Sequence, residues 1–510
     1  MAGGQMAAGA GMQARGGWRR AWPRLAVAVA ALAAIAVALV MLTREGAGIE
    51  RTEMQIGQIP ATLHALPGTE GAPLVVVAHG FAGSRQFMQS FSLTLARAGY
   101  AALAFDFAGH GDNRVPMSRD VNSVDGTTRL LMDETHAVIE AGKALPQAGG
   151  GVALLGHSMA TDVIVRAAAE REDVDAIVAV SMYSEAVTET HPQRLLMVTG
   201  AWEPPLREAS VDNLQMVAPG AQEGETVRDG GVVRRAVVAP RVEHVGVLYS
   251  ETTLREARDW LDATFDRDSG ETAIAQRGPW VALLMGGIVA LAWPLFSALP
   301  SRVAAPVPSW RALAMGCAVP ALAAPLLLWP VETDVLPVLI ADYLALHLGL
   351  YGLIQLAVLW ALGYRLPRGP VWPAAALAAW TIGVFGLALD TFGASFMPHA
   401  GRAAIIGAVA LGAVPFMLGD AVAIAGGRAT FLRRLAVRAA FLASLAIAVA
   451  LDYEGLFFLI LILPIIVLFF LVYGSIGAWV GRRAGPLASG LALGLALAWA
   501  IGVSFPLFAA

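Results

Sequence analysis

The sequence predicts a protein of two parts, an α/β domain with a mainly parallel sheet and an all-α membrane domain. The first observation is composition: 57% of the 510 residues are hydrophobic and only 15% are charged, which is too apolar for a soluble protein. Secondly, short apolar runs alternate with helical periodicity over residues 50–268. Thirdly, about nine apolar runs, most of them within 279–510, approach the roughly 20 residues that a bilayer-spanning helix needs.

The N-terminal residues predict a tail and an anchor. Residues 1–24 are rich in Gly and Ala and carry several arginines, which is typical of a disordered basic tail. Residues 25–43 are almost wholly apolar. A transmembrane anchor is favoured over a cleaved signal peptide, because the apolar run is long and no small-residue cleavage site follows it.

The α/β domain is expected to extend over residues 50–268. Its apolar runs predict strands at 53–58, 61–66, 73–78, 101–105, 152–155, 176–180, 195–198 and 236–239. Its helical periodicity predicts helices at 86–98, 127–143, 161–170, 206–217 and 252–265. Asp229-Gly230 between strand-like runs predicts a hairpin. Strands that alternate with helices indicate a mainly parallel sheet with helices on both faces.

The membrane domain, residues 279–510, is expected to cross the bilayer about eight more times. The predicted spans are 279–298, 310–330, 336–363, 372–391, 403–424, 431–451, 455–480 and 486–509. Arginines gather in every second connector, which predicts that the α/β domain lies on the extracytoplasmic side. Because Lys143 is the single lysine, the basic residues are nearly all Arg, which hints at a GC-rich bacterial genome and a bacterial cytoplasmic membrane.

A serine in a tight turn is the strongest chemical signal. Gly156-His157-Ser158-Met159-Ala160 follows an apolar strand and precedes a helix, which is the context of a nucleophile elbow. Such a turn exposes the serine oxygen beside backbone N–H groups at a helix start. An ordinary strand-to-helix turn with a serine cap is the alternative.

Two further residues complete a possible triad. Glu203 follows the strand at 195–198, and His244 lies in the loop after the last strand, so the chain order is serine, acid, histidine. The acid could instead be Asp212 or another carboxylate. Glu243 is disfavoured, because adjacent residues on an extended segment point in opposite directions.

An oxyanion hole is expected beside the serine. The strand at 73–78 leads into His79-Gly80-Phe81, and the backbone N–H groups of Phe81 and Met159 could hold a developing negative charge. A plain glycine loop before a helix is the alternative for the first of these segments.

Taken together, residues 50–268 resemble an α/β-hydrolase of the serine esterase/lipase type. The motifs that carry the resemblance are His79-Gly80-Phe81, Asp106 to Gly111, Gly156 to Ala160, Gly200 to Glu203 and Glu243-His244. The resemblance implies an eight-stranded sheet with Ser158 as nucleophile, His244 as base and Glu203 as acid. Ala160 in place of Gly, and Glu203 in place of the commoner Asp, depart from the pattern of that family.

Other partners are disfavoured. Asp106, His110 and Asp112 could suggest metal ligands but are expected to shape a loop, so no metal or cofactor is predicted. The single cysteine excludes an intrachain disulfide, and the net charge of −4 argues against nucleic acid. The connection at 181–193 is too short for a cap, so either the site is open or the membrane domain and the loop 107–126 cover it.

The sequence therefore favours a membrane-integrated serine hydrolase that cleaves acyl or lipid esters at the outer face of the membrane. An acyltransferase with the same triad is one alternative. A transporter or channel-like protein with a regulatory α/β domain is another, because Asp342 and His347 are ionisable groups inside a predicted span. Hydrogen bonding between helices is the structural interpretation of these two residues.

Overall fold

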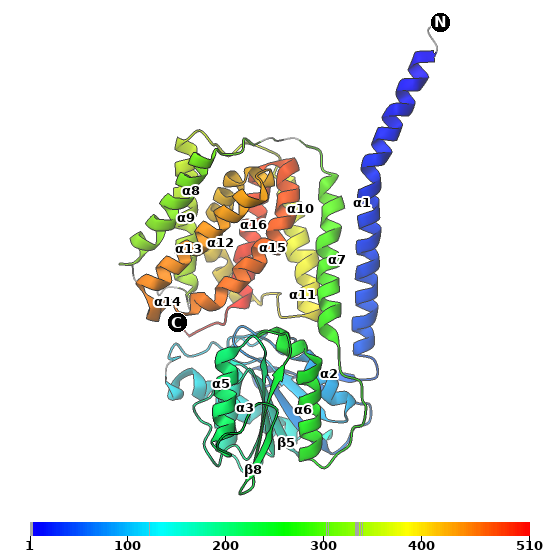
Figure 1. Ribbon diagram of the computed structural model, residues 1–510, viewed down its shortest axis with the longest axis vertical. Coiled ribbons are helices and arrows are strands. Elements are labelled where there is room, and N and C mark those ends of the chain that lie inside the picture. The colour runs from blue at the N-terminus through cyan, green and yellow to red at the C-terminus, as the bar shows by residue number, and fades with distance from the viewer. Residues whose placement is uncertain are drawn as a thin grey trace.

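The structure is a computed structural model that describes residues 4–121, 123–301, 303, 305–331, 336, 338 and 340–509, with side chains from residue 22 onward except at 461. The α/β domain lies below a bundle of long helices, and helix α1 (Gly4–Glu45) runs beside helix α7 (Arg277–Ser297) (Figure 1). A side chain added at Gly287 of α7 would meet Ile35 of α1 at 2.8 Å, so these two helices pack closely.

Helix α1 corrects the prediction for the N-terminal residues. It begins at Gly4, so residues 4–24 are helical rather than a disordered tail, and residues 1–3 lie outside the described residues. The physical reason is composition, because Ala, Met, Gln and Arg are strong helix formers and outnumber the glycines that weaken a helix. The apolar part, Trp22–Glu45, is long enough to span a membrane, as predicted for the anchor.

The sheet has the predicted mainly parallel form, with one strand more than expected. Its described strands are β1 (Glu50–Ile56), β2 (Ile59–Ala65), β3 (Ala72–Ala78), β4 (Ala101–Phe105), β5 (Ala148–His157), β6 (Ala176–Val180), β7 (Arg194–Gly200), β8 (Thr226–Asp229) and β9 (Val232–Ala239). Their order is β1-β2-β4-β3-β5-β6-β7-β9-β8. The central six pair in parallel, and the pairs at both edges are antiparallel. The ninth strand is β8, because the Asp229-Gly230 turn folds it back on β9.

Helices cover both faces of the sheet. The described helices of this domain are α2 (Gln89–Arg97), α3 (Arg129–Lys143), α4 (Met159–Ala169), α5 (Pro204–Gln215) and α6 (Glu251–Thr264). Alternate residues of a strand point to opposite faces. Thus Val75 and Val77 pack in a core with α2 and α6, whereas Leu74 and Val76 pack in a core with α3, α4 and α5.

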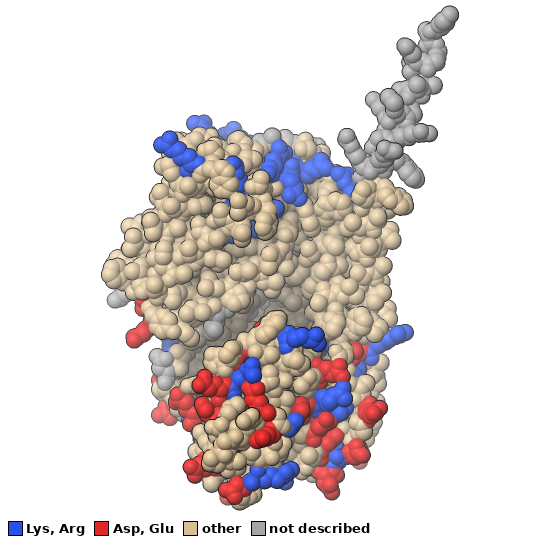
Figure 2. Space-filling model, viewed as in Figure 1, with Lys and Arg blue, Asp and Glu red and all other residues tan. Residues whose placement is uncertain are grey.

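The helical domain confirms the predicted pattern of spans. Nine helices in the described part of the chain are long and apolar enough to cross a membrane. After α7 they comprise α8 (Trp310–Leu328), α9 (Ala341–Ala361), α10 to α11 (Trp372–Phe392), α12 (Ala403–Ala423), α13 (Phe431–Leu451), α14 to α15 (Tyr453–Ala484) and α16 (Pro486–Ser504). On the visible face, an uncharged band separates the charged α/β domain from a basic end of the bundle (Figure 2).

The basic end gathers the connectors that sequence analysis identified as rich in arginine. Arg428 donates to the backbone oxygens of Val303 and Arg482, both at 3.0 Å. Arg433 donates to the backbone oxygen of Pro308 at 2.6 Å. The arginine-rich connectors therefore meet at one end of the bundle, opposite the end that faces the α/β domain (Figures 1 and 2).

Candidate active site

Ser158 stands at the predicted turn, between the end of β5 and the start of α4. Its backbone has φ 54° and ψ −120°, a conformation that residues other than glycine rarely adopt and that is typical of a strained functional turn. A side chain at Gly156 would meet the Cδ1 atom of Ile164 at 2.8 Å, which explains the small residue before the serine. Position 160 is more commonly glycine in the family pattern. Here Ala160 is fully buried, and its methyl group fits within the packed interior.

The structure brings together the three residues predicted to form a triad. The Nε2 atom of His244 lies 2.9 Å from Oγ of Ser158, and its Nδ1 atom lies 2.5 Å from Oε1 of Glu203. These contacts form a continuous hydrogen-bond chain from hydroxyl to imidazole to carboxylate, within reach for proton transfer. The three side chains come from turns after β5, β7 and β9, whose carboxyl ends meet at one edge of the sheet.

Glu203 is the carboxylate that contacts the imidazole, in preference to the other acids considered. Burial opposes its ionisation, but hydrogen bonds donated by His244, by the backbone N–H of Gly200 and by Ser181 outweigh burial and lower the pKa of Glu203. The neighbouring Glu243 instead accepts hydrogen bonds from the backbone N–H groups of the turn that follows His244.

Two residues of this site were not predicted in these roles. Ser181 follows β6 and donates a hydrogen bond of 2.8 Å to Oε2 of Glu203, which fixes the carboxylate. Its φ of 52° is also unusual for a residue other than glycine. The one sequence signal for Ser181 is its place at the end of a central strand, beside the edge where the other site residues gather.

The second of these residues, His157, supports the loop of His244. Its Nε2 atom donates to the backbone oxygen of His244 at 2.9 Å, and the two rings lie 4.8 Å apart. Burial first, and the neighbouring imidazole second, lower the pKa of His157 to about 3. His157 therefore stays neutral at physiological pH and adds no positive charge beside an imidazolium at His244.

The predicted oxyanion loop approaches Ser158 closely. A side chain at Gly80 would lie 3.0 Å from atoms of both His157 and Ser158, so a larger residue would crowd the turn that carries the serine. Phe81 and Met159 line the same pocket as Ser158 and His244. Met159 begins α4, so its N–H has no acceptor within the helix and is available to a ligand.

The residues considered as metal ligands bind protein groups. The backbone N–H of Arg85 donates to Asp106 at 2.7 Å, its guanidinium forms an ion pair with the same carboxylate, and the backbone N–H of Asp112 donates to it at 3.0 Å. His110 hydrogen bonds the backbone oxygen of Ala108. Asp106 thus ties the loop after β3 to the loop after β4. Among the described residues, no group of three or more His, Cys, Asp and Glu is placed to hold a metal ion.

The pocket above Ser158 has a volume of about 750 Å³. Part of its wall belongs to the α/β domain and includes Met117, Val121, Leu131, Val163 and Leu206. Another part is Phe458, at the start of helix α15 in the helical domain, whose ring lies 5.5 Å from that of Phe81. Both domains therefore contribute to the pocket.

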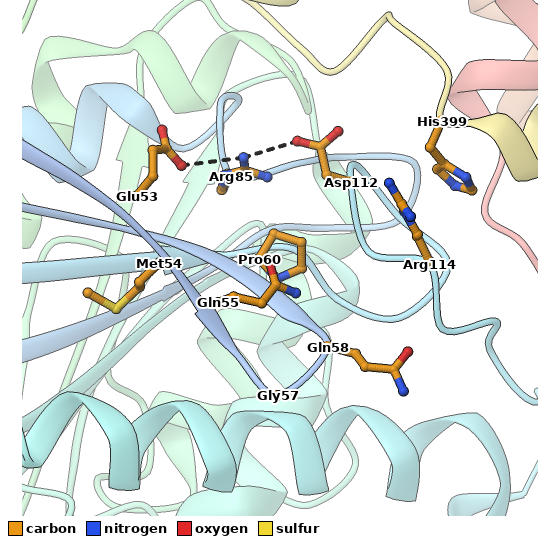
Figure 3. A pocket seen from close by; sticks show the side chains of 10 residues that line it. All are labelled: Glu53, Met54, Gln55, Gly57, Gln58, Pro60, Arg85, Asp112, Arg114 and His399. Carbon is orange, nitrogen blue, oxygen red and sulfur yellow. Dashed lines mark hydrogen bonds and ion pairs between the residues drawn. The ribbon is translucent and has the colours of Figure 1, made fainter.

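A second cavity of about 680 Å³ lies beside the turn between β1 and β2 (Figure 3). Arg85 stands between Glu53 and Asp112 in its wall, at 3.6 Å and 3.0 Å from their carboxylates (Figure 3). Arg114 and His399 line its far side. This wall holds none of the residues predicted for catalysis, and the charges of its acids and arginines largely balance one another.

The two candidate residues of the membrane domain are not together. Asp342 lies in the first turn of α9, where it accepts from the backbone N–H of Leu336, so it stands at the start of the span rather than inside it as predicted. The helix of this span begins at Ala341, later than predicted, so Asp342 is the second residue of the helix. His347 is fully buried and contacts Oγ of Ser444 in α13 at 2.9 Å, as expected for hydrogen bonding between helices.

Comparison with known proteins finds similarity in the α/β domain. Residues 70–227 match the family model described as Serine aminopeptidase, S33. Similar solved structures include a dienelactone hydrolase from Anabaena variabilis, which is 19% identical with a TM-score of 0.32 over 43% of this chain and 98% of the other. Est1E from Butyrivibrio proteoclasticus, solved with ferulic acid, is 17% identical with a TM-score of 0.33 over 42% and 100%. No curated protein matches the chain.

Proposed function

We propose, from the premise that the N-terminal half of this chain contains an α/β-hydrolase domain, that the protein is a membrane-integrated serine hydrolase of carboxylic esters. The observation that carries the proposal is the hydrogen-bond chain from Ser158 through His244 to Glu203. A serine hydroxyl is a weak nucleophile until a base accepts its proton, and this chain supplies both the base and the group that orients it.

The proposed reaction proceeds in two steps. Nε2 of His244 accepts the proton of Ser158 as its oxygen attacks the ester carbonyl, and Glu203 stabilises the resulting imidazolium. The backbone N–H groups of Phe81 and Met159 hold the oxyanion. The imidazolium then returns the proton to the departing alcohol, which leaves an acyl-enzyme, and a water molecule activated by the same histidine releases the acid.

The proposed substrate is an acyl or lipid ester that reaches the site from the bilayer. The apolar wall of the pocket suits an acyl chain, and Phe458 places that wall at the end of a membrane helix. Tyr453 and Phe457 are exposed near the same helix end, as aromatic residues at a membrane surface commonly are. The arginine-rich connectors at the opposite end favour an extracytoplasmic α/β domain on a bacterial cytoplasmic membrane.

Peptide hydrolysis is a second candidate, favoured by the description of the matching family model as an aminopeptidase. The same triad can cleave an amide, and the pocket wall includes the carboxylates of Asp162 and Glu185. Asp162 is paired with Arg166 at 2.7 Å, however, so only part of this negative charge is available to an α-ammonium group. Comparing the rates for matched ester and aminoacyl-amide substrates separates the two functions, and adding acceptor alcohols detects acyl transfer.

The test of the proposed function is labelling of the purified full-length protein with a fluorophosphonate. We expect labelling and ester hydrolysis in the wild type, and loss of both in Ser158→Ala, with the hydrolytic rate falling by at least about a thousandfold. Ser92→Ala is the control, because Ser92 lies in α2 of the same domain and bonds the backbone oxygen of Met88 rather than the triad or the pocket wall. Hydrolysis that persists in Ser158→Ala would contradict the proposal.

A further inference from the structure

The segment that follows the last membrane helix enters the α/β domain. Residues 505–509 leave α16 and pass between the two domains, where Figure 1 marks the end of the chain. Phe508 is only 2% exposed and belongs to the hydrophobic core of the α/β domain, together with Phe107, Met117 and Leu131. A residue of the membrane half therefore completes the core on one face of the sheet.

Backbone hydrogen bonds join this segment to the loop after β4. The N–H of Met117 donates to the oxygen of Leu507 at 2.7 Å, and the N–H of Ala509 donates to the oxygen of Met117 at 2.6 Å. The N–H of Leu507 donates to the oxygen of Gly109 at 2.9 Å. Met117 and Phe508 form a parallel β-bridge, so the segment pairs with the loop as an added short strand.

A buried arginine and a glycine make this junction specific. Arg402 is 2% exposed, and its guanidinium donates to the oxygens of Gly502 and Phe505 in the membrane half and of Gly109 in the α/β domain. A side chain at Gly109 would lie 2.5 Å from the oxygen of Leu507, and its φ of 74° also favours glycine. The two backbones approach too closely for any larger residue.

The same loop forms one wall of the catalytic pocket. Met117 and Val121 line the pocket that contains Ser158 and His244. Met117 thus pairs with segment 505–509 through its backbone and is also one of the residues that line the pocket. The connection between β6 and β7 is short and supplies no cap, so this loop is a major part of what faces the serine.

We propose that segment 505–509 determines acyl-chain selectivity by fixing the loop 109–121 as a wall of the catalytic pocket. The inference rests on the proposed ester hydrolysis and assigns the segment a positioning role, since it does not itself line the pocket. With the segment paired, the wall holds one shape and contacts the distal part of a long acyl chain. Without it, the wall moves and long acyl chains lose those contacts, while the triad keeps its own hydrogen bonds.

The test compares esters of short and long acyl chains on the full-length protein in detergent. The measured quantity is kcat/KM for a long ester divided by kcat/KM for a short ester. In Phe508→Ala we expect this quotient to fall about tenfold, because a small loss of apolar contact in a binding pocket changes kcat/KM by about that factor. Leu411→Ala is the matched control, because Leu411 is 80% exposed on a membrane helix and touches neither the loop nor the pocket. We expect that control to keep the wild-type ratio.

A reversible crosslink keeps the test decisive if Phe508→Ala folds poorly. Met117→Cys with Phe508→Cys, in a Cys317→Ser background, places two thiols at the β-bridge. We expect the oxidised protein to favour long esters more than the same protein after reduction. An equal ratio in the two redox states, or a ratio unchanged in Phe508→Ala, would overturn the inference. Fluorophosphonate labelling of Ser158 in the same samples reports separately on the proposed function.

Discussion

Ser158, Glu203 and His244 come from three turns that follow parallel strands of one sheet, whereas the wall opposite them is assembled from both domains. The first group depends on hydrogen bonds within the α/β domain. The second depends on Phe458 and on segment 505–509, which arrive from the membrane half. The difference separates two properties of the proposed site. The α/β domain holds the groups proposed to cleave the bond, and the junction is proposed to shape the space for the substrate.

Among the residues that support Ser158, replacing Glu203 is expected to give the largest effect, since it acts on the hydrogen-bond chain itself. Glu203→Gln removes the negative charge that orients His244 and offsets its positive charge, and we expect kcat to fall by about ten-thousandfold. Hydrolysis of a short soluble ester measures this loss without involving the pocket wall. Glu203→Asp, which keeps the charge, should recover part of the activity. A Gln variant as active as the Asp variant would show that the charge is not needed.

Phe458→Ala tests the membrane contribution and is expected to have a smaller effect. The ring of Phe458 packs on that of Phe81, whose N–H is proposed to hold the oxyanion. Removing it should loosen the oxyanion loop and lower kcat by about tenfold, which is less than the loss of a whole oxyanion donor. Ile460→Ala, at an exposed residue of the same helix, is the control. Equal rates in both variants would mean that the membrane helix does not position the loop.

These two groups of residues also differ in how far the sequence predicts them. The convergence of Ser158, Glu203 and His244 could be predicted because carboxyl ends of parallel strands meet at one edge, so motifs far apart in the chain come together. Ser181 and His157 could not be given their roles, since those depend on a left-handed φ and on one backbone carbonyl. Nothing in the sequence distinguishes Phe458 from the many other aromatic residues of the apolar runs.

The junction was predicted only in outline, and the reason lies in its contacts. Because the connection after β6 is short, the sequence left two possibilities: an open site, or a site covered by the loop 107–126 and the membrane domain. It did not indicate segment 505–509, whose pairing with Met117 uses backbone groups that any residue carries. The family resemblance implied eight strands, whereas the hairpin signal at Asp229-Gly230 pointed to the edge strand β8 that makes the ninth.

Ser181→Ala is expected to have a modest effect within the catalytic group. It removes one hydrogen bond to Glu203 while the bonds from Gly200 and His244 remain. A lost hydrogen bond to a charged group is worth about 1.5 kcal/mol, so we expect kcat to fall by about tenfold or less. Because Ser181 helps to lower the pKa of Glu203, the acidic limb of the pH–rate profile should also move to higher pH. An unchanged profile would argue that Ser181 is only a packing residue.

The smallest effect on activity is expected at Glu134, which lies behind the loop of the pocket wall and acts through stability. Its carboxylate accepts hydrogen bonds from the backbone N–H of Ala108 and from Asn113, and burial raises its pKa from 4.5 to about 7. The folded protein therefore holds this proton more tightly than the unfolded chain, so the associated stability is present below pH 4.5 and is lost as the pH rises to about 7.

Glu134→Gln cannot lose a proton, so it removes this pH dependence. We expect the difference in Tm, variant minus wild type, to be a few degrees larger at pH 7 than at pH 4.5. The reason is that a pKa difference of about 2.5 units corresponds to roughly 3 kcal/mol of stability. Taking the difference between the two proteins cancels the titration of the buried histidines, which both share. Ester hydrolysis at pH 8 should change little, because the loop keeps its pairing with segment 505–509. A constant difference in Tm over this pH range would mean that the carboxyl group is already ionised in the folded protein at pH 4.5. The hydrogen bonds from Ala108 and Asn113, which favour the ionised form, would then outweigh the burial that disfavours it.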